Sequence, residues 1–498
     1  MELFHLYAAC FILAVSSLYL LRLLTGARHN LPPGPRPLPL VGNLFDLGLH
    51  PHRSLARLAA RHGPLMTLRL GTVTTIVASS ADTARDVLQR HDAVFSARFV
   101  PDVARACAYD RHSMAWLPSG SPRCRALRKV CSGELFAPHR LDAHQSLRRE
   151  KVQRLVSYVG RLAREGTPVD VGRVAFTTAL NLLACTIFSA DLADLDDRGA
   201  SGAFKDVIAE FTVTVGTANV SDFFPAVAPL DPQRLRRRVA GVFKRLHAMF
   251  DAQIERRTRE RAAGQPAKND FLDVLLDYRG TEDGRGFDRQ TLRSLLTDLF
   301  SAGSDTSAET VEWAMAELLQ NPSSMARARE ELAQVVNSKL GIEESDIGHL
   351  KYLQAIVKET LRLHPTASFL LPRQAEKTTE IRGYTVPKGV RILVNVWAIG
   401  QDSEVWSEPE KFMPERFVEK EIDFRGRDFE FLPFGSGRRM CPGMPLAIRM
   451  AHLMLASLLH RFEWRLPADI EKNGVDMSEK PGMLLALAKP LHAIAKAV

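Results

Sequence analysis

Residues 434–443 read Phe434-Gly435-Ser436-Gly437-Arg438-Arg439-Met440-Cys441-Pro442-Gly443. A thiolate that ligates a metal must be deprotonated and shielded from oxidants. The glycines let the backbone approach a flat ligand and aim N–H groups at the sulfur, and Arg439 offers a fork of donors to a carboxylate. Pro442 is expected to open a helix over the apolar run Leu446 to Leu459, which favours a negative charge on Cys441. The segment therefore predicts Cys441 as a metal ligand, and the alternative is a buried structural cysteine in a glycine-rich loop.

The pattern Phe-x-x-Gly-x-Arg-x-Cys-x-Gly resembles the haem-binding signature of the cytochromes P-450. The resemblance extends over essentially the whole chain and implies a mainly α fold with small antiparallel β-sheets. It implies haem b as the cofactor, with Cys441 as the axial thiolate of the iron. Within the segment, the residues expected to contact the haem are Phe434, Gly437, Arg439 and Gly443.

Composition narrows the class of protein further. The chain has 498 residues, of which 46 % are hydrophobic, and a formal net charge of +9. No concentrated basic stripe accompanies a nucleic-acid-binding motif, so we expect no nucleic-acid partner; the charge suits a membrane surface and an acidic redox partner. The cysteines show no CxxC pair and no finger spacing, which favours a reducing compartment with one functional thiolate.

The N-terminus carries an uncharged run from Leu3 to Leu21, close to the length that spans a bilayer core. Glu2 precedes the run while Arg22 and Arg28 follow it, which predicts a single-pass anchor with the catalytic part in the cytosol, on the endoplasmic reticulum. A cleavable signal peptide is the alternative. We divide the chain into a membrane anchor with a basic stop (1–30), a proline-rich hinge (31–40) and a haem-thiolate catalytic domain (41–498).

Hydrophobic spacing predicts the main elements. The predicted helices are Gln153 to Glu165, Leu235 to Arg261, Arg289 to Leu319, Ser323 to Val336 and Gln354 to Leu363. The predicted strands are Leu65 to Leu70, Thr74 to Ala78, Tyr384 to Gly389 and Arg391 to Asn395.

The helix from Arg289 to Leu319 contains an interruption at Ala302-Gly303-Ser304-Asp305-Thr306. Gly, Ser, Asp and Thr are poor mid-helix residues because they compete with the backbone for hydrogen bonds. Bound dioxygen needs space and delivered protons, so we expect Thr306 and Asp305 to form a catalytic proton relay. An Asp–Thr pair that caps a separate helix is the alternative.

Charged residues elsewhere fit two further roles. Glu359 and Arg362 lie three residues apart on one helical face, and with Arg416 they resemble the family's Glu-Arg-Arg triad, a buried charge network that holds the cysteine loop. Besides Arg439, the expected ligands of the haem propionates are Arg373 and Arg128. Cys124 stands where the family has a tryptophan, and its thiol is a weak hydrogen-bond donor.

The resemblance places substrate contacts in five stretches: Phe99 to Leu117, Val207 to Phe224, Leu299 to Thr306, Thr366 to Leu371 and Met483 to Leu487. These stretches are mostly apolar, which suits a hydrocarbon that is recognised by shape. The pocket residues that we select are Phe224, Ala302, Phe369, Leu370 and Met483. Pro481 stands where the related subfamily has an aromatic residue.

Four segments resemble the plant microsomal subfamily that oxidises terpenoids: Ser113 to Pro118, Lys268 to Leu276, Val394 to Gly400 and Asp476 to Lys480. The expected reaction is hydroxylation of an apolar terpenoid, a labdane-related diterpene olefin such as ent-cassadiene in phytoalexin biosynthesis. NADPH electrons would arrive through cytochrome P-450 reductase, with cytochrome b5 as a second candidate partner. The alternatives are a monoterpenol or phenylpropanoid oxidase, a peroxide isomerase or dehydratase, and a catalytically weak haem-binding relative.

Overall fold

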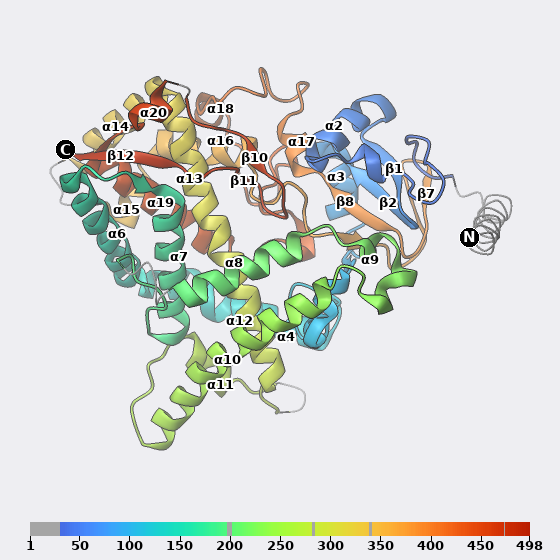
Figure 1. The fold of residues 1–498 in the computed structure, drawn as a ribbon, viewed down its shortest axis with the longest axis horizontal. Helices are drawn as coiled ribbons and strands as arrows, with labels where there is room; N and C mark the ends of the chain where they lie inside the picture. The colour runs from blue at the N-terminus through green and yellow to red at the C-terminus, as the bar shows by residue number, and fades with distance from the viewer. Residues whose placement is uncertain (1–29, 197–201, 281–283, 338–340, 473) are drawn as a thin grey trace, which may run out of the picture.

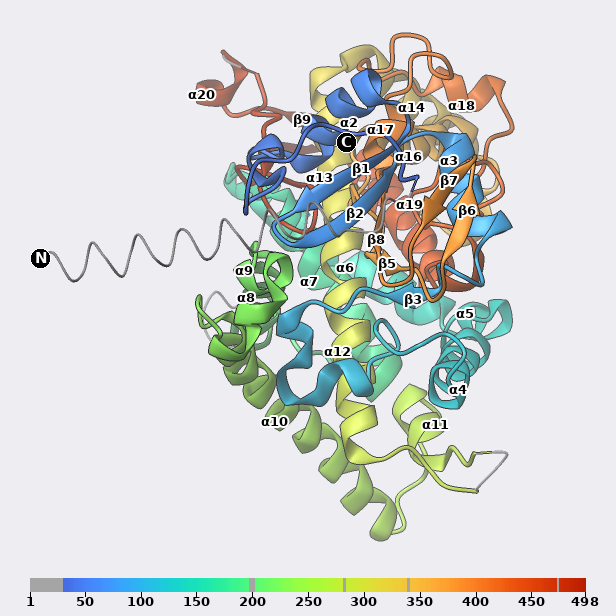
Figure 2. The ribbon, with the colours of Figure 1, turned by 90° about the vertical axis from the view of Figure 1, so that its right-hand side faces the viewer.

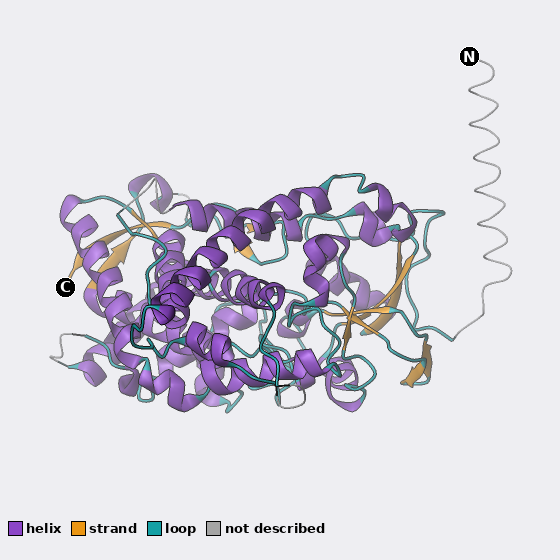
Figure 3. Cartoon of the chain, turned by 90° about the horizontal axis from the view of Figure 1, so that it is seen from below, coloured by secondary structure: helices purple, strands orange, loops and turns teal. Residues whose placement is uncertain are grey.

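The computed structural model describes residues 30–196, 202–280, 284–337, 341–472 and 474–498. Helices make up most of this part of the chain (Figure 3). The N-terminal helices are α2 (Pro51–His62), α3 (Ala81–Arg85), α4 (Pro122–Val130), α5 (Pro138–Ala143), α6 (Gln145–Glu165), α7 (Val171–Phe188), α8 (Gly202–Gly216), α9 (Val220–Phe223), α10 (Leu235–Ala262) and α11 (Phe271–Asp277). The later helices are α12 (Arg289–Gly303), α13 (Asp305–Gln320), α14 (Pro322–Val336), α15 (Glu344–Ile347), α16 (Lys351–Leu363), α17 (Val396–Gly400), α18 (Glu415–Glu419), α19 (Met444–Arg461) and α20 (Ala468–Glu471).

Short strands form small sheets beside the helices. They are β1 (Leu65–Leu70), β2 (Val73–Ala78), β3 (Ala97–Arg98), β4 (Val169–Asp170), β5 (Arg373–Gln374), β6 (Thr379–Ile381), β7 (Tyr384–Val386), β8 (Arg391–Val394), β9 (Phe462–Arg465), β10 (Glu479–Lys480), β11 (Ala486–Leu487) and β12 (His492–Ala497). The largest sheet has the order β1-β2-β8-β5-β3. Its strands β2 and β8 run parallel, so this sheet is mixed, whereas the sheets β4-β12-β9, β6-β7 and β10-β11 are antiparallel.

Two helices placed end to end, α12 and α13, run through the middle of the molecule (Figure 2). They pack against α7 and α19, and the four helices contribute to one large apolar core. Helix α7 is mostly apolar and most of its residues are buried, as expected of a helix in a protein core. Within the described residues it is the one helix long and apolar enough to span a membrane, but 78 % of it is buried inside the protein, as in a core helix.

The predicted elements are found with shifted ends: α6 begins at Gln145 and not at Gln153, and the predicted helix Arg289 to Leu319 is two helices. The observed counterparts of the five predicted helices are α6, α10, α12 with α13, α14 and α16, and those of the four predicted strands are β1, β2, β7 and β8. The predicted membrane anchor, Leu3 to Leu21, lies outside the described residues. The proline-rich segment packs against strand β1: the N–H of Thr67 donates to Pro33 O at 2.8 Å. A Cβ on Gly34 would lie 1.9 Å from Thr67 O, so only glycine allows this approach.

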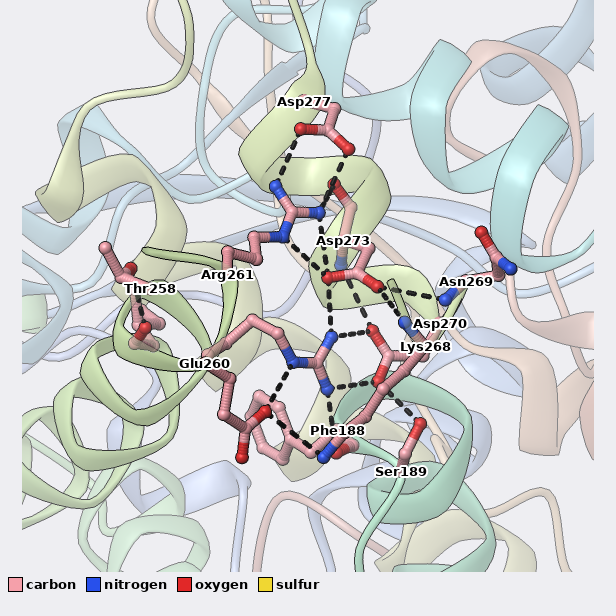
Figure 4. Close-up of polar contacts among 12 residues, drawn as sticks. Phe188, Ser189, Thr258, Glu260, Arg261, Lys268, Asn269, Asp270, Asp273 and Asp277 are labelled. Carbon is pink, nitrogen blue, oxygen red and sulfur yellow. Dashed lines mark hydrogen bonds and ion pairs between the residues drawn. The ribbon is translucent and has the colours of Figure 1, made fainter. Parts of the chain in front are cut away.

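A buried charge network fixes the C-terminal end of α10 (Figure 4). Arg257 donates to Asp270 and to Asp273 at 2.6–2.7 Å, and all three side chains are at most 5 % exposed. Arg257 also donates to the carbonyl of Phe188, the last residue of α7. Arg261 donates to Asp273 and Asp277 of α11. The network therefore joins the ends of α10 and α7 to α11.

Candidate active site

The segment around Cys441 forms a tight loop between the η6 turn (Gly437–Arg439) and α19. Its backbone closes through a hydrogen bond from Cys441 N to Phe434 O at 3.0 Å. Gly437 has φ of 71°, and a Cβ there would lie 2.3 Å from Leu88 O, so this position requires glycine. Helix α19 begins at Met444, and the expectation that Pro442 opens it was wrong: Pro442 belongs to the loop, and the proline of the first turn is Pro445.

The pKa of the Cys441 thiol is raised overall, and burial is the largest cause. Burial raises the pKa of the thiol, while the N–H groups of Gly443 and Met444, which donate to the sulfur, and the charge of Arg128 lower it. Cys441 retains accessible surface although many protein atoms surround it, so we assign that surface to an internal space. Ala302, which lies on the central helix α12, is exposed as well.

The arginines assigned to the propionates lie close to the cysteine loop. Arg128 Nη2 donates to Met440 O at 2.9 Å, and Arg373 Nη2 donates to Ser436 O at 3.3 Å. Arg439 is 7 % exposed. Its guanidinium donates to three backbone carbonyls, one just before β3 and two before α4. The acceptors are Ser96, Met114 and Leu117.

Sequence reasoning missed a fourth member of this group, Arg98. The register of β3 against β5 pairs Arg98 with Arg373. Burial lowers the pKa of Arg98 well below its usual range, and the charges of Arg373, Arg439 and Arg128 lower it further. The Nε atoms of Arg98 and Arg373 are buried without a hydrogen-bond partner in the described chain.

This arginine cluster fits the two propionates of a haem. Four mutually repelling guanidinium groups, of which Arg98 and Arg373 each have an unpartnered Nε, favour an anionic ligand, because carboxylates would accept hydrogen bonds and neutralise the charge. Asp92 accepts from Arg373 at 3.3 Å, and its single negative charge compensates only part of the positive charge of the four arginines. The donor set and the accessible sulfur of Cys441 are therefore compatible with haem b.

Cys124, which stands where the family has a tryptophan, lies beside Arg439. It is fully buried in α4, and its sulfur accepts a long contact from Arg439 Nη1 at 3.8 Å. A thiol at this distance is a poor partner for a guanidinium. Arg439 is held mainly by backbone carbonyls instead.

The interruption of the central helix separates α12 from α13 at Ser304. Ser304 makes no side-chain cap, and the hydroxyl of Thr306 donates to Ala302 O at 2.7 Å. The side chain of Asp305 accepts a hydrogen bond from Thr212 of α8 at 2.7 Å. Burial raises the pKa of Asp305 to about 6, although the bond from Thr212 lowers it. A carboxyl group that titrates near neutrality can both accept and release a proton.

The structure brings the three triad residues together behind the cysteine loop. Glu359 accepts from Arg362 Nε at 2.7 Å and from Arg416 Nε at 3.0 Å, and the side chains of Glu359 and Arg362 are fully buried. Glu359 also accepts from the N–H of Met413 at 2.9 Å. Arg362 donates to the carbonyl of Gly400. The triad therefore ties α16 to the segment that leads to the cysteine loop.

The five residues assigned to the pocket occupy different places. Leu370 contacts the cysteine loop, since its Cδ1 lies 3.3 Å from the position of a Cβ on Gly435. Phe369 forms a β-bridge with Asn395 and packs in the apolar cluster of β1 and β2. Phe224 lies against Gly71 in the β1–β2 turn, and Met483 lies against Gly216 at the end of α8. Phe224 and Met483 thus lie in contacts between α8, α9, the β-sheet and the β10–β11 hairpin.

Sequence reasoning also missed Asp298, a fully enclosed carboxylate of α12. It accepts from Tyr109 Oη, from Ser113 Oγ at 2.7 Å and from Met114 N at 2.7 Å. Burial raises the pKa of Asp298 to about 6, and these hydrogen bonds lower it. The available signal was an acidic residue between Leu295-Leu296 and Leu299-Phe300, on the apolar side of a predicted helix. Asp298 holds the first predicted substrate-contact stretch on the central helix.

Comparison with known proteins agrees with this geometry. The family model described as Cytochrome P450 matches residues 32–493. The chain is 48 % identical to a geraniol 8-hydroxylase of Catharanthus roseus, covering 93 % of this chain and 94 % of the relative. It is 47 % identical to a geraniol 8-hydroxylase of Swertia mussotii (94 % and 93 % covered) and 41 % identical to a ferruginol synthase of Salvia miltiorrhiza (99 % of both chains). The chain belongs to the cytochrome P450 family and is a haem-thiolate monooxygenase that receives its electrons from a reductase.

Proposed function

We propose that the protein hydroxylates a monoterpenol. The observation that carries this proposal is the 47–48 % identity to two geraniol 8-hydroxylases over nearly the whole chain. The apolar character of Phe224, Ala302, Phe369, Leu370 and Met483 supports a small hydrocarbon body as the substrate. This substrate replaces the diterpene olefin as the first choice, because the geraniol 8-hydroxylases are more similar to the chain than the ferruginol synthase is.

In the proposed site each residue has a defined task. When bound, the haem supplies reductive activation of O2 and transfer of one oxygen atom to a C–H bond. Cys441 would be the axial ligand, its charge stabilised by the N–H groups of Gly443 and Met444. Arg98, Arg128, Arg373 and Arg439 would hold the propionates.

Proton delivery is assigned to Asp305 and Thr306. Asp305 would receive a proton from the side of α8, where Thr212 holds it, and Thr306 would present its hydroxyl on the side of Ala302. The two side chains make no hydrogen bond to each other in this structure, so a change of rotamer, or a water molecule, must connect them.

A second candidate substrate is a labdane-related diterpene olefin such as ent-cassadiene. The match to a ferruginol synthase over 99 % of both chains favours it. The test incubates microsomes that contain the protein and its reductase with geraniol and with ent-cassadiene, and identifies products by mass spectrometry. Oxidation of geraniol supports the first proposal. Oxidation of the diterpene alone, or of neither compound, contradicts it.

We also propose cytochrome b5 as a second electron donor. Residues 1–30 would anchor the protein in the endoplasmic reticulum membrane, and residues 31–40 would set the orientation of the catalytic domain 41–498. Exposed apolar side chains on the described part of the chain support a membrane-facing surface. These are Phe45 (77 % exposed), Leu49 (77 %) and Leu230 (72 %). Removal of residues 1–29 should release the protein from membranes with its haem spectrum intact.

A further inference from the structure

Strand β8 carries a buried arginine, Arg391, that has no part in the site described above. The residue is 6 % exposed, and its Nε donates to Thr75 Oγ1 at 2.9 Å. Its Nη2 is enclosed and has no hydrogen-bond partner in the described chain. An enclosed cationic donor without an acceptor is energetically unfavourable. We therefore expect such a donor in a folded protein to bind a ligand that supplies the acceptor.

The charge of Arg391 is not neutralised by a protein carboxylate. Arg391 forms no ion pair with any described residue, and burial lowers the pKa of its guanidinium to about 10. Asp222 is the acidic group whose charge acts on it, but Asp222 Oδ1 accepts the N–H of Asp102 at 2.6 Å. Burial also raises the pKa of Asp222, which weakens it as a counter-ion.

The surroundings of this guanidinium belong to the predicted substrate region. Its Cζ lies 4.9 Å from the ring centroid of Phe99 and 5.6 Å from that of Phe223, and both rings fall within predicted substrate-contact stretches. Leu393 is two residues further along β8 and therefore on the same face. It packs in the apolar cluster that contains Phe369 and Phe223. A cation whose Nη2 has no partner in the described chain thus lies beside aromatic residues of the predicted substrate-contact stretches.

We propose that Arg391 binds the carboxylate of an apolar terpenoid acid. This inference goes beyond the proposed function: it adds a second class of ligand, molecules with a hydrocarbon body and an anionic end. The terminal N–H groups of a guanidinium can donate two parallel hydrogen bonds to a carboxylate, which also neutralises the charge. An alcohol accepts through one oxygen and leaves the charge in place, so the acid binds more tightly than the alcohol.

The test compares three ten-carbon ligands on the ferric holoenzyme: geranic acid, geraniol and the hydrocarbon myrcene. Dissociation constants are measured at pH 7.5 by equilibrium dialysis and by the change in haem absorbance. In the wild type, geranic acid should bind most tightly. Arg391→Gln should weaken geranic acid by about tenfold to a hundredfold, as expected for a lost charge-assisted hydrogen bond, and change myrcene by less than about twofold.

Two further variants separate recognition from folding. Arg391→Lys keeps the charge without the fork and should retain part of the acid preference, which decides the question if Arg391→Gln does not fold. Arg425→Gln, at a side chain that is 71 % exposed, is the matched control and should change nothing. Equal weakening of acid and hydrocarbon, or no acid preference in the wild type, overturns the proposal. Turnover of geraniol with reductase tests the proposed function separately, because acid binding does not depend on it.

Discussion

Replacing Glu359 by Gln removes the negative charge that two buried arginines share. Glu359 and Arg362 are fully buried, and the Arg416 side chain is 6 % exposed. Glutamine keeps one acceptor oxygen but turns an NH2 group toward a guanidinium, so at least one bond is lost and two positive charges remain uncompensated. Breaking a buried ion pair costs about 3–5 kcal/mol. We therefore expect this loss in the free energy of unfolding.

The loss can be read as a shift of the melting temperature. An unfolding entropy of about 2.1 cal/mol/K per residue gives roughly 1 kcal/mol/K for a chain of this length, so Tm should fall by about 3–5 °C. The assay is scanning calorimetry of the haem-loaded protein at a fixed scan rate. The control is Glu415→Gln, whose ion pair with Arg327 is exposed (38 % and 51 %) and should cost less than about 1 kcal/mol. Equal shifts in the two variants would refute the assignment of a buried network.

Three other predictions concern single side chains. Cys441→Ser should abolish the red-shifted Soret band of the reduced carbon monoxide complex, and a persistent band would show that another cysteine ligates the iron. Thr306→Ala should leave haem and substrate binding intact but divert electrons to hydrogen peroxide, with product formation lowered by about 10²–10⁴; unchanged coupling of NADPH to product would remove Thr306 from the relay. The pKa of Asp298 is raised to about 6, whereas it is about 3.9 in the unfolded chain, so the folded state binds the proton more tightly. The free energy of unfolding should therefore fall as pH rises from about 4 to about 6. Asp298→Asn should remove this slope from urea midpoints measured between pH 4 and 7, and an unchanged slope would contradict it.

The parts of the site that sequence could predict are those whose information is local. The loop Phe434 to Gly443 contains its own ligand, glycines and arginine within ten residues, and the helices follow from regular apolar spacing. The poor helix formers around Ser304 also predicted the break that separates α12 from α13.

The residues that sequence reasoning missed depend on contacts between distant segments. Asp298 accepts from Met114, 184 residues earlier, through a backbone N–H that any residue would supply. Arg98 joins the propionate group because β3 pairs with β5, a register set by the whole sheet. Pro442 was assigned to the helix because a proline before an apolar run favours a helix start. In the structure Pro442 belongs instead to the loop that directs the N–H groups of Gly443 and Met444 toward the Cys441 sulfur.

The network at the C-terminal end of α10 sets the point about which this helix can rotate. At 1.5 Å per residue, the 28 residues of α10 span about 42 Å. The charges around Arg257 fix one end to α7 and α11, whereas the other end begins beside the loop that follows α9 (Figure 1) and is held by the partly exposed ion pair of Arg236 with Asp102. A tilt of about 5° about the C-terminal end would displace the N-terminal end by roughly 4 Å, given that length. A small rotation can thus move the segment before α10 by several ångströms while the network around Arg257 stays intact and no helix unwinds.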